Sequence, residues 1–249
     1  MVSGLGYTST RQRAMRKAHL LSRHIFQSAA STKFVVCAAM AMLFSSCGDG
    51  GSPTSMAVAD QLNIVFFGDS ITEAWKTWGH LNVYLPSEIN AGVSGNTTAM
   101  MLERIQGDVL DKHPAVVILL GGTNDLADGY ANVPGVHSYP DEAALFKIIE
   151  LCEAAGAQVI VGTVPPLPPQ YGGVGWPNQW NQAIKDGAAE YGYTVVDYYP
   201  LFLTPTGTQD PNEYVQDLVH PSVTGFQRMW SVMWPALDNF IWNYEPHGT

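Results

Sequence analysis

The chain has few basic residues outside its first 47 positions, and this shortage argues against binding to polyanions. Six of its 12 Lys and Arg residues lie within residues 1–47, a stretch that contains no acid. From Gly48 onward, the other six basic residues are set against all 22 acidic ones, a formal balance of −16. Such an acidic body is a poor partner for nucleic acid or anionic lipid through charge, so we expect no nucleic-acid binding.

Cysteine is also scarce, with three residues in 249. Two of them, Cys37 and Cys47, lie near the N-terminus, so Cys152 is alone in the body and cannot form an internal disulfide. Cys152 falls inside a predicted helix, where we expect it to be a buried small hydrophobe. The ordinary composition, 46% hydrophobic and 14% charged, predicts one globular domain with its own core.

The N-terminal region has no apolar run long enough to cross a bilayer of ~30 Å. Phe34–Phe44 is an uncharged, mostly apolar stretch that follows the basic residues and precedes small ones. This order is typical of an export signal, which would carry the body to the periplasm, the cell surface or the medium. The sequence Leu-Phe-Ser-Ser-Cys resembles a bacterial lipoprotein signal, in which Cys47 becomes a lipid anchor. The alternative is a plain secretory signal that is cut within 45–59.

The domain organisation follows from this pattern. Residues 1–47 are the predicted export signal, and residues 48–60, which are small and polar, are a predicted tether. Residues 61–249 form the predicted globular domain. Short apolar runs typical of buried strands alternate there with helical patterns, which predicts a parallel sheet covered on both faces. The expected strands are Leu62–Phe67, Glu88–Gly92, Ala115–Leu120, Gln158–Val161 and Tyr193–Asp197, and the expected helices are Ile71–Gly79, Thr97–Leu110, Asp141–Ala155, Trp180–Tyr191 and Val223–Trp242.

Several common catalytic and nucleotide-binding motifs are missing. The chain has no G-x-S-x-G elbow, no G-x-x-x-x-G-K-[ST] loop, no G-x-G-x-x-G after a strand and no H-E-x-x-H. His80, His113 and His137 are scattered and lack metal-ligand spacing. We therefore expect no cofactor and no metal.

Four short segments with unusual residues follow expected strands or precede the last expected helix. They are Gly68-Asp-Ser-Ile-Thr72, Gly92-Val-Ser-Gly-Asn96, Gly121-Gly-Thr-Asn-Asp125 and Asp217-Leu-Val-His-Pro221. In this order, they resemble the four blocks of the SGNH hydrolases, also called GDSL-type esterases and lipases. The resemblance spans about residues 62–240. It implies a flavodoxin-like, three-layer α/β/α sandwich with a mostly parallel five-stranded sheet, in agreement with the alternating pattern.

Ser70 has two interpretations, a helix cap or a nucleophile, and the nucleophile needs a base. His220 is the candidate base, because imidazole ordinarily titrates near neutrality. Asp217, three residues earlier, is close enough in the chain to hold the ring N–H. The resemblance assigns the oxyanion donors to the N–H groups of Ser70 and Gly95 and to the side-chain amide of Asn124.

Two further acids, Asp69 and Asp125, flank these segments. We interpret both as loop-organising residues that hydrogen-bond local backbone rather than as members of the triad. Substrate choice is expected to depend on the long loops 126–140 and 163–180. Five aromatic side chains in or near the site segments either bind substrate or pack the loop bases, namely Trp75, Trp78, Tyr171, Trp176 and Trp180.

The predicted function is that of an exported serine ester hydrolase acting on a small-molecule ester. The favoured substrate is a short acyl group, most plausibly acetyl, on carbohydrate or a small ester. One alternative is a lysophospholipase or acyl-thioesterase that cuts longer chains. Another is a catalytically inactive binding module on the same scaffold, which would have no need of all five residues Ser70, Gly95, Asn124, Asp217 and His220.

Overall fold

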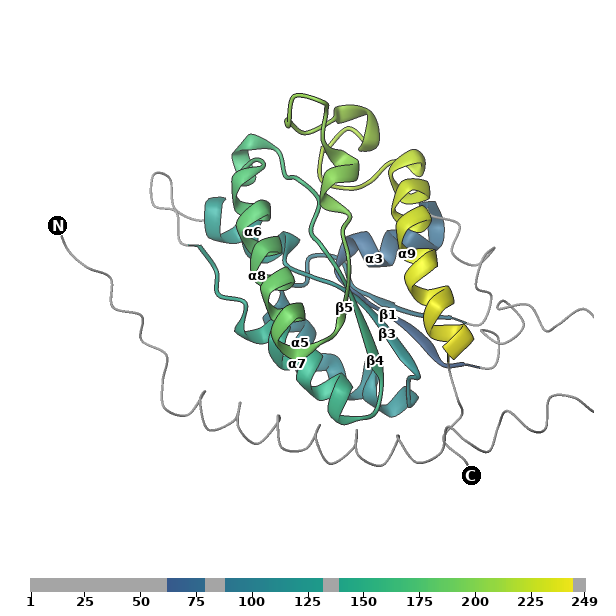
Figure 1. Ribbon diagram of the computed structural model, residues 1–249. Helices are drawn as coiled ribbons and strands as arrows, with labels where there is room; N and C mark the ends of the chain where they lie inside the picture. The colour runs from purple at the N-terminus through teal and green to yellow at the C-terminus, as the bar shows by residue number, and fades with distance from the viewer. Residues whose placement is uncertain (1–61, 79–87, 132–138, 244–249) are drawn as a thin grey trace, which may run out of the picture. The chain divides into compact units, whose positions relative to one another are not determined.

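A computed structural model describes residues 62–78, 88–131 and 139–243. The chain divides into residues 1–51 and 52–249, and every described residue belongs to the second unit. The expected export signal and tether therefore lie outside the described residues. The described part is an α/β fold around one twisted sheet (Figure 1).

The sheet has five strands in the order β2-β1-β3-β4-β5, and every neighbouring pair is parallel. The central strands consist almost entirely of apolar residues, because both of their faces are covered. The expected strands are confirmed, with ends that differ by one or two residues. Their bounds are β1 Ile64–Gly68, β2 Ile89–Gly92, β3 Val116–Leu120, β4 Gln158–Gly162 and β5 Thr194–Val196.

Helices cover both faces of the sheet and give the predicted three layers. On one face, Phe66 and Ile118 pack in a single cluster with residues of α3 (Ser70–Trp78) and α9 (Val223–Asn243). On the other face, alternate residues of the same strands, such as Phe67 and Val117, pack with the remaining helices. These helices are α5 Thr98–Asp108, α6 Thr123–Ala131, α7 Ala143–Ala154 and α8 Gly175–Tyr191. Cys152 is fully buried in this second cluster, which confirms its predicted role.

Two predictions about helices were wrong. Residues 123–131, expected to be loop, form α6, and its first turn includes Asp125. Helix α8 begins at Gly175 rather than at Trp180 and includes Pro177 near its start. Helix α6 directly follows Gly121 and Gly122, and α8 begins with Gly175 and Pro177, which are signals typical of loops. A helix tolerates Gly and Pro in its first turn, where the N–H groups have no partner within the helix.

The order of the strands fixes where a ligand can bind. From β1 the chain moves to β2 on one side, and from β3 it moves to β4 on the other. The segments after β1 and β3 therefore diverge and leave a crevice beyond the carboxyl ends of the strands, the usual ligand site of such sheets. Ser70 follows β1 and Asn124 follows β3, and each lies in the first turn of a helix at this edge.

Candidate active site

Ser70 is the first residue of α3, but its hydroxyl does not cap the helix. Asp69 performs that task, because its carboxylate accepts the N–H of Ile71 at 2.9 Å. The Ser70 hydroxyl instead contacts a ring nitrogen of His220, with Oγ and Nε2 2.8 Å apart. The two residues are 150 positions apart in the chain. Ser70 is thus free to react, while its neighbour supplies the helix with an acceptor.

Asp217 and His220 form a tight turn just before α9. The Asp217 carboxylate accepts the backbone N–H groups of Val219 at 2.8 Å and His220 at 2.9 Å. Its other oxygen lies 2.7 Å from His220 Nδ1. Between them, Leu218 adopts a left-handed conformation with a φ of 58°, which costs a leucine about 1–3 kcal/mol. Leu218 is held there by packing against the core and by a 2.7 Å bond from Gln209 to its carbonyl.

These contacts fix the direction of the hydrogen bonds. An ionised carboxylate can only accept, so Nδ1 of His220 donates to Asp217. In the neutral ring Nε2 then accepts from the Ser70 hydroxyl. Hydrogen bonds from His220 and Val219 stabilise the ionised carboxylate of Asp217. Partial burial alone would raise the pKa of Asp217, but these bonds outweigh it and hold the pKa below its usual value. His220 Nε2 can therefore take the proton of the Ser70 hydroxyl as Ser70 Oγ attacks an electrophile.

Besides Ser70, the residues assigned as oxyanion donors lie on the segments after β2 and β3. Gly95 is exposed in a turn with a φ of 77°, a conformation that suits glycine. Asn124 lies in the first turn of α6, and its amide donates to the carbonyl of Asn96 at 2.9 Å. This bond uses one of the two amide hydrogens of Asn124. The structure thus links the Gly95 loop to Asn124.

The two flanking acids organise the loops in different ways. Asp69 bonds the adjacent backbone, as expected. Asp125 does not: its carboxylate accepts the N–H of Thr98, 27 residues away, and so ties α6 to α5. Burial raises the pKa of Asp69 to about 6, although the Ile71 N–H lowers it. The Thr123 hydroxyl also favours the ionised form of Asp69. However, no hydrogen bond of ordinary geometry joins these two buried side chains.

A cavity of about 450 Å³ opens beside Ser70 and His220. Sequence analysis missed two of the residues that line it, Glu73 and Ser94. The Glu73 carboxylate accepts the N–H of Ser94 at 2.9 Å, so it joins α3 to the loop that carries Gly95. The helical spacing from Ser70 to Glu73 was the available signal, because residues three apart share a helix face. The full lining is Ser70, Glu73, Ala74, Thr77, Ser94, Val215, Asp217, His220 and Pro221.

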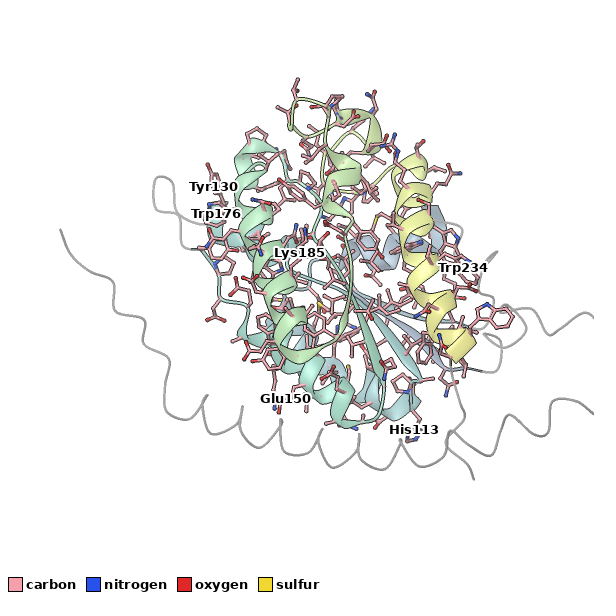
Figure 2. The ribbon with its side chains drawn as sticks, in the orientation of Figure 1. His113, Tyr130, Glu150, Trp176, Lys185 and Trp234 are labelled. Atoms are coloured by element: carbon pink, nitrogen blue, oxygen red, sulfur yellow. The ribbon has the colours of Figure 1, made fainter. Side chains whose placement is uncertain are left out.

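Most of the described aromatic candidates pack rather than face solvent. Trp75 is 1% exposed and Trp180 is fully buried, so packing is the correct interpretation for both. Trp176 makes edge contacts with Tyr130 and Tyr139, with ring centres 5.1 and 5.3 Å apart. Figure 2 shows Tyr130 and Trp176 side by side at the α6–α8 side of the molecule. The side chain of Trp78 lies outside the described residues.

Metal-ligating side chains do not gather in groups of three or more anywhere in residues 62–78, 88–131 and 139–243. His113 precedes β3 at the end of the sheet opposite Ser70 (Figure 2), while His80 and His137 lie outside the described residues. In the same part of the chain, no helix combines the length and apolar character needed to span a membrane.

A flavodoxin-like sandwich with Ser, His and Asp in hydrogen-bond contact beyond its strand ends has the architecture of an SGNH-type hydrolase. Comparison with known families agrees. The chain belongs to the GDSL-like Lipase/Acylhydrolase family, whose model matches residues 66–228. It is therefore a carboxylic ester hydrolase by class.

Two curated relatives and two solved structures extend this comparison. Esterase TesA of Pseudomonas aeruginosa is 27% identical over 213 residues, 81% of this chain and 99% of the relative. An uncharacterized lipoprotein of Bacillus subtilis, YqeF, is 25% identical over 197 residues, 64% of this chain and 81% of the relative.

Among solved structures, a GDSL-like lipase of Bacteroides thetaiotaomicron has a TM-score of 0.58 at 26% identity, covering 72% of this chain and 89% of the other. An acetylxylan esterase of Geobacillus stearothermophilus has a TM-score of 0.59 at 24% identity. That match covers 71% of this chain and 94% of the esterase, and it shows a common fold.

Proposed function

We propose that the chain is an exported serine esterase that removes short acyl groups, above all acetyl, from carbohydrate or small esters. The observation that carries the proposal is the hydrogen-bonded series from Ser70 through His220 to Asp217, with contacts of 2.8 and 2.7 Å. A nucleophile, a base and a group that orients the base are the minimum that acyl transfer to serine requires.

In the proposed mechanism, Ser70 Oγ attacks the ester carbonyl and its proton passes to His220 Nε2. The carbonyl oxygen becomes an oxyanion, which accepts hydrogen bonds from the N–H groups of Ser70 and Gly95 and from the Asn124 amide. When the tetrahedral intermediate collapses, the alcohol leaves with the proton from His220. Water, deprotonated by the same ring, then attacks the acyl-enzyme and releases the acid and free Ser70. Asp217 stays ionised and stabilises the imidazolium.

The cavity beside Ser70 supports the choice of a short acyl group. Its lining mixes hydroxyl, carboxylate and small side chains, with Val215 and Pro221 as apolar members. A long acyl chain gains its affinity from apolar surface, at roughly 0.8 kcal/mol for each buried CH₂, and this lining offers little of it. The acidic residues Glu73 and Asp217 also disfavour substrates with an anionic headgroup.

Two alternative functions remain, and a single hydrolysis experiment distinguishes both of them from the proposed one. A lysophospholipase or acyl-thioesterase would use the same residues on longer chains. A binding module would not turn over ester at all, and the contact between Ser70 and His220 argues against it, because binding alone needs no polarised hydroxyl.

The test is hydrolysis of p-nitrophenyl esters from acetate to palmitate by the full chain and its Ser70→Ala variant. We expect the highest kcat/KM on acetate or butyrate and a loss of more than about 10³-fold in the variant. A maximum at long chains would favour the lysophospholipase or thioesterase. Equal rates in both proteins, or no turnover, would favour the binding module.

We also propose that residues 1–47 direct export, that residues 48–60 tether the domain, and that Cys47 carries the lipid. The Bacillus subtilis relative, named as a lipoprotein, supports this. In bacteria expressing the chain, labelled palmitate should enter the wild-type protein but not its Cys47→Ser variant. Export without any label would leave the plain secretory signal as the explanation.

A further inference from the structure

Arg104, in the middle of α5, contacts three separate segments of the active-site edge. Its guanidinium donates to the carbonyl of Gly68 at 2.8 Å, to the carbonyl of Ala91 at 2.8 Å and to the side chain of Asn96 at 2.6 Å. It also pairs with Asp108 at 2.7 Å. With its side chain only 19% exposed, Arg104 is a largely buried cation that uses four hydrogen bonds.

The positions of these acceptors connect Arg104 to the site. Gly68 is the last residue of β1, two positions before Ser70, and Ala91 belongs to β2. Asn96 follows Gly95 directly, and its own carbonyl accepts the amide of Asn124. One side chain therefore holds the strand end before Ser70 and the loop that carries Gly95, an assigned oxyanion donor, and that contacts Asn124, another.

The geometry requires arginine rather than positive charge alone. A guanidinium presents five N–H groups in a rigid plane, so it can reach acceptors from three segments at once. The plane also lies over the ring of Phe67, with Cζ 4.6 Å from the ring centre. Lysine, with one ammonium on a flexible stem, cannot satisfy this arrangement.

We propose that Arg104 is a positioning residue that holds the Gly95–Asn96 loop, and through Asn96 the Asn124 amide, in the geometry that binds the oxyanion. The inference rests on the proposed function, because it takes Asn124 as an oxyanion donor. Oxyanion donors act only when they are aimed at the developing charge, so a small displacement of this loop lowers kcat more than it raises KM.

The test is a double-mutant cycle on p-nitrophenyl acetate with the full chain. We expect Asn124→Ala to lower kcat by about 10²–10³-fold. We expect Arg104→Gln to lower kcat by about 10–100-fold, with KM changed less than about 3-fold. In the Asn124→Ala background, Arg104→Gln should cost clearly less than in the wild type, because the part of its effect that passes through the Asn124 amide is then already lost. Losses that multiply would overturn the inference.

Two further variants and a control make the outcome specific. Arg104→Lys should lower kcat as much as Arg104→Gln does. A wild-type kcat in Arg104→Lys would overturn the role given to the planar guanidinium. If the Arg104 variants fail to fold, Asn96→Ala decides, because it removes one acceptor of Arg104 and leaves α5 intact. We expect about a 10-fold loss of kcat that becomes smaller in the Asn124→Ala background.

Lys185→Gln is the matched control. Lys185, on α8 (Figure 2), makes an ion pair of the same 2.7 Å length with Asp197, on the far side of the sheet from β2. Its kcat should stay within about 2-fold of wild type. If the proposed function is wrong, the wild-type protein will not turn over the ester, or its turnover will not depend on Ser70. Turnover that requires Ser70 and Asn124 but not Arg104 would reject the inference alone.

Discussion

The Asp217 carboxylate accepts two hydrogen bonds from His220, one from the backbone N–H at 2.9 Å and one from ring Nδ1 at 2.7 Å. The backbone contact fixes the turn, and the ring contact fixes the tautomer. The two contacts can be separated by a substitution that preserves the shape of Asp217 but changes its hydrogen-bonding capacity.

Asp217→Asn should lower kcat on p-nitrophenyl acetate by about 10³–10⁴-fold while leaving the thermal unfolding temperature almost unchanged. An asparagine carbonyl can still accept the backbone N–H groups, which preserves the turn. Its NH₂ group then donates to Nδ1, so Nε2 carries the proton and can no longer accept one from Ser70.

Asp210→Asn is the control for that measurement. Asp210 accepts the N–H of Asn212 at 3.0 Å in a similar turn, but no histidine ring is held there. It should retain kcat within about 2-fold. Equal losses in the two variants would mean that Asp217 acts only through the loop.

Burial of Asp69 predicts an unusual dependence of stability on pH. The pKa of Asp69 is raised from 3.8 to about 6 in the folded protein. Between these values the unfolded chain has lost the proton and the folded chain has kept it, so the unfolded state binds fewer protons and stability falls as pH rises. The loss through this window amounts to about 3 kcal/mol.

Asp69→Asn should abolish this loss, since asparagine can still accept the Ile71 N–H without a charge. The free energy of unfolding in urea, measured at pH 4 and pH 7, should favour the variant by about 2–3 kcal/mol more at pH 7 than at pH 4. Asp141→Asn is the control, because exposed Asp141 accepts the Ala143 N–H in the same way without burial. An identical pH profile for wild type and Asp69→Asn would contradict the prediction.

Two exposed glycines near the site should respond oppositely to alanine. Gly95 has a φ of 77°, so Gly95→Ala should destabilise the fold by about 1–2 kcal/mol and lower kcat by displacing the Gly95 N–H. Gly107 lies within α5, and a Cβ there would meet no atom within 4 Å. Gly107→Ala should therefore stabilise the fold by up to about 1 kcal/mol and leave kcat unchanged. Thermal unfolding and steady-state kinetics on both variants check this, and a drop in kcat for Gly107→Ala would count against it.

The sequence predicted the layers of the fold well because the local pattern carries the needed information. Runs such as Val116–Leu120 can be buried only if both faces of the sheet are covered, and the alternation of strands and helices then leaves few topologies. The boundary of α8 was missed because Gly175 and Pro177 suggest a loop, although the first turn of a helix accepts both.

The sequence pattern predicts only some of the contacts at the candidate site, for the same reason. Ser70, Asp217 and His220 stand out by residue type and by position relative to strands and helices. The partner of Asp125 could not be found in this way, because Thr98 lies 27 residues away and only the fold brings the first turns of α5 and α6 together. Arg104 was overlooked likewise, since two of its four acceptors are backbone carbonyls, which have no signature in a sequence.

Helix α9 covers one face of the sheet and begins three residues after His220. Its buried face, which includes Phe226, Met229 and Met233, fills the cluster beneath β1 and β3. The sheet is complete by Val196, whereas the contact between His220 and Ser70 needs the segment that leads into this last helix. On the proposed mechanism, we therefore expect a nascent chain to hydrolyse no ester until α9 has packed, so that ester turnover would report the end of folding.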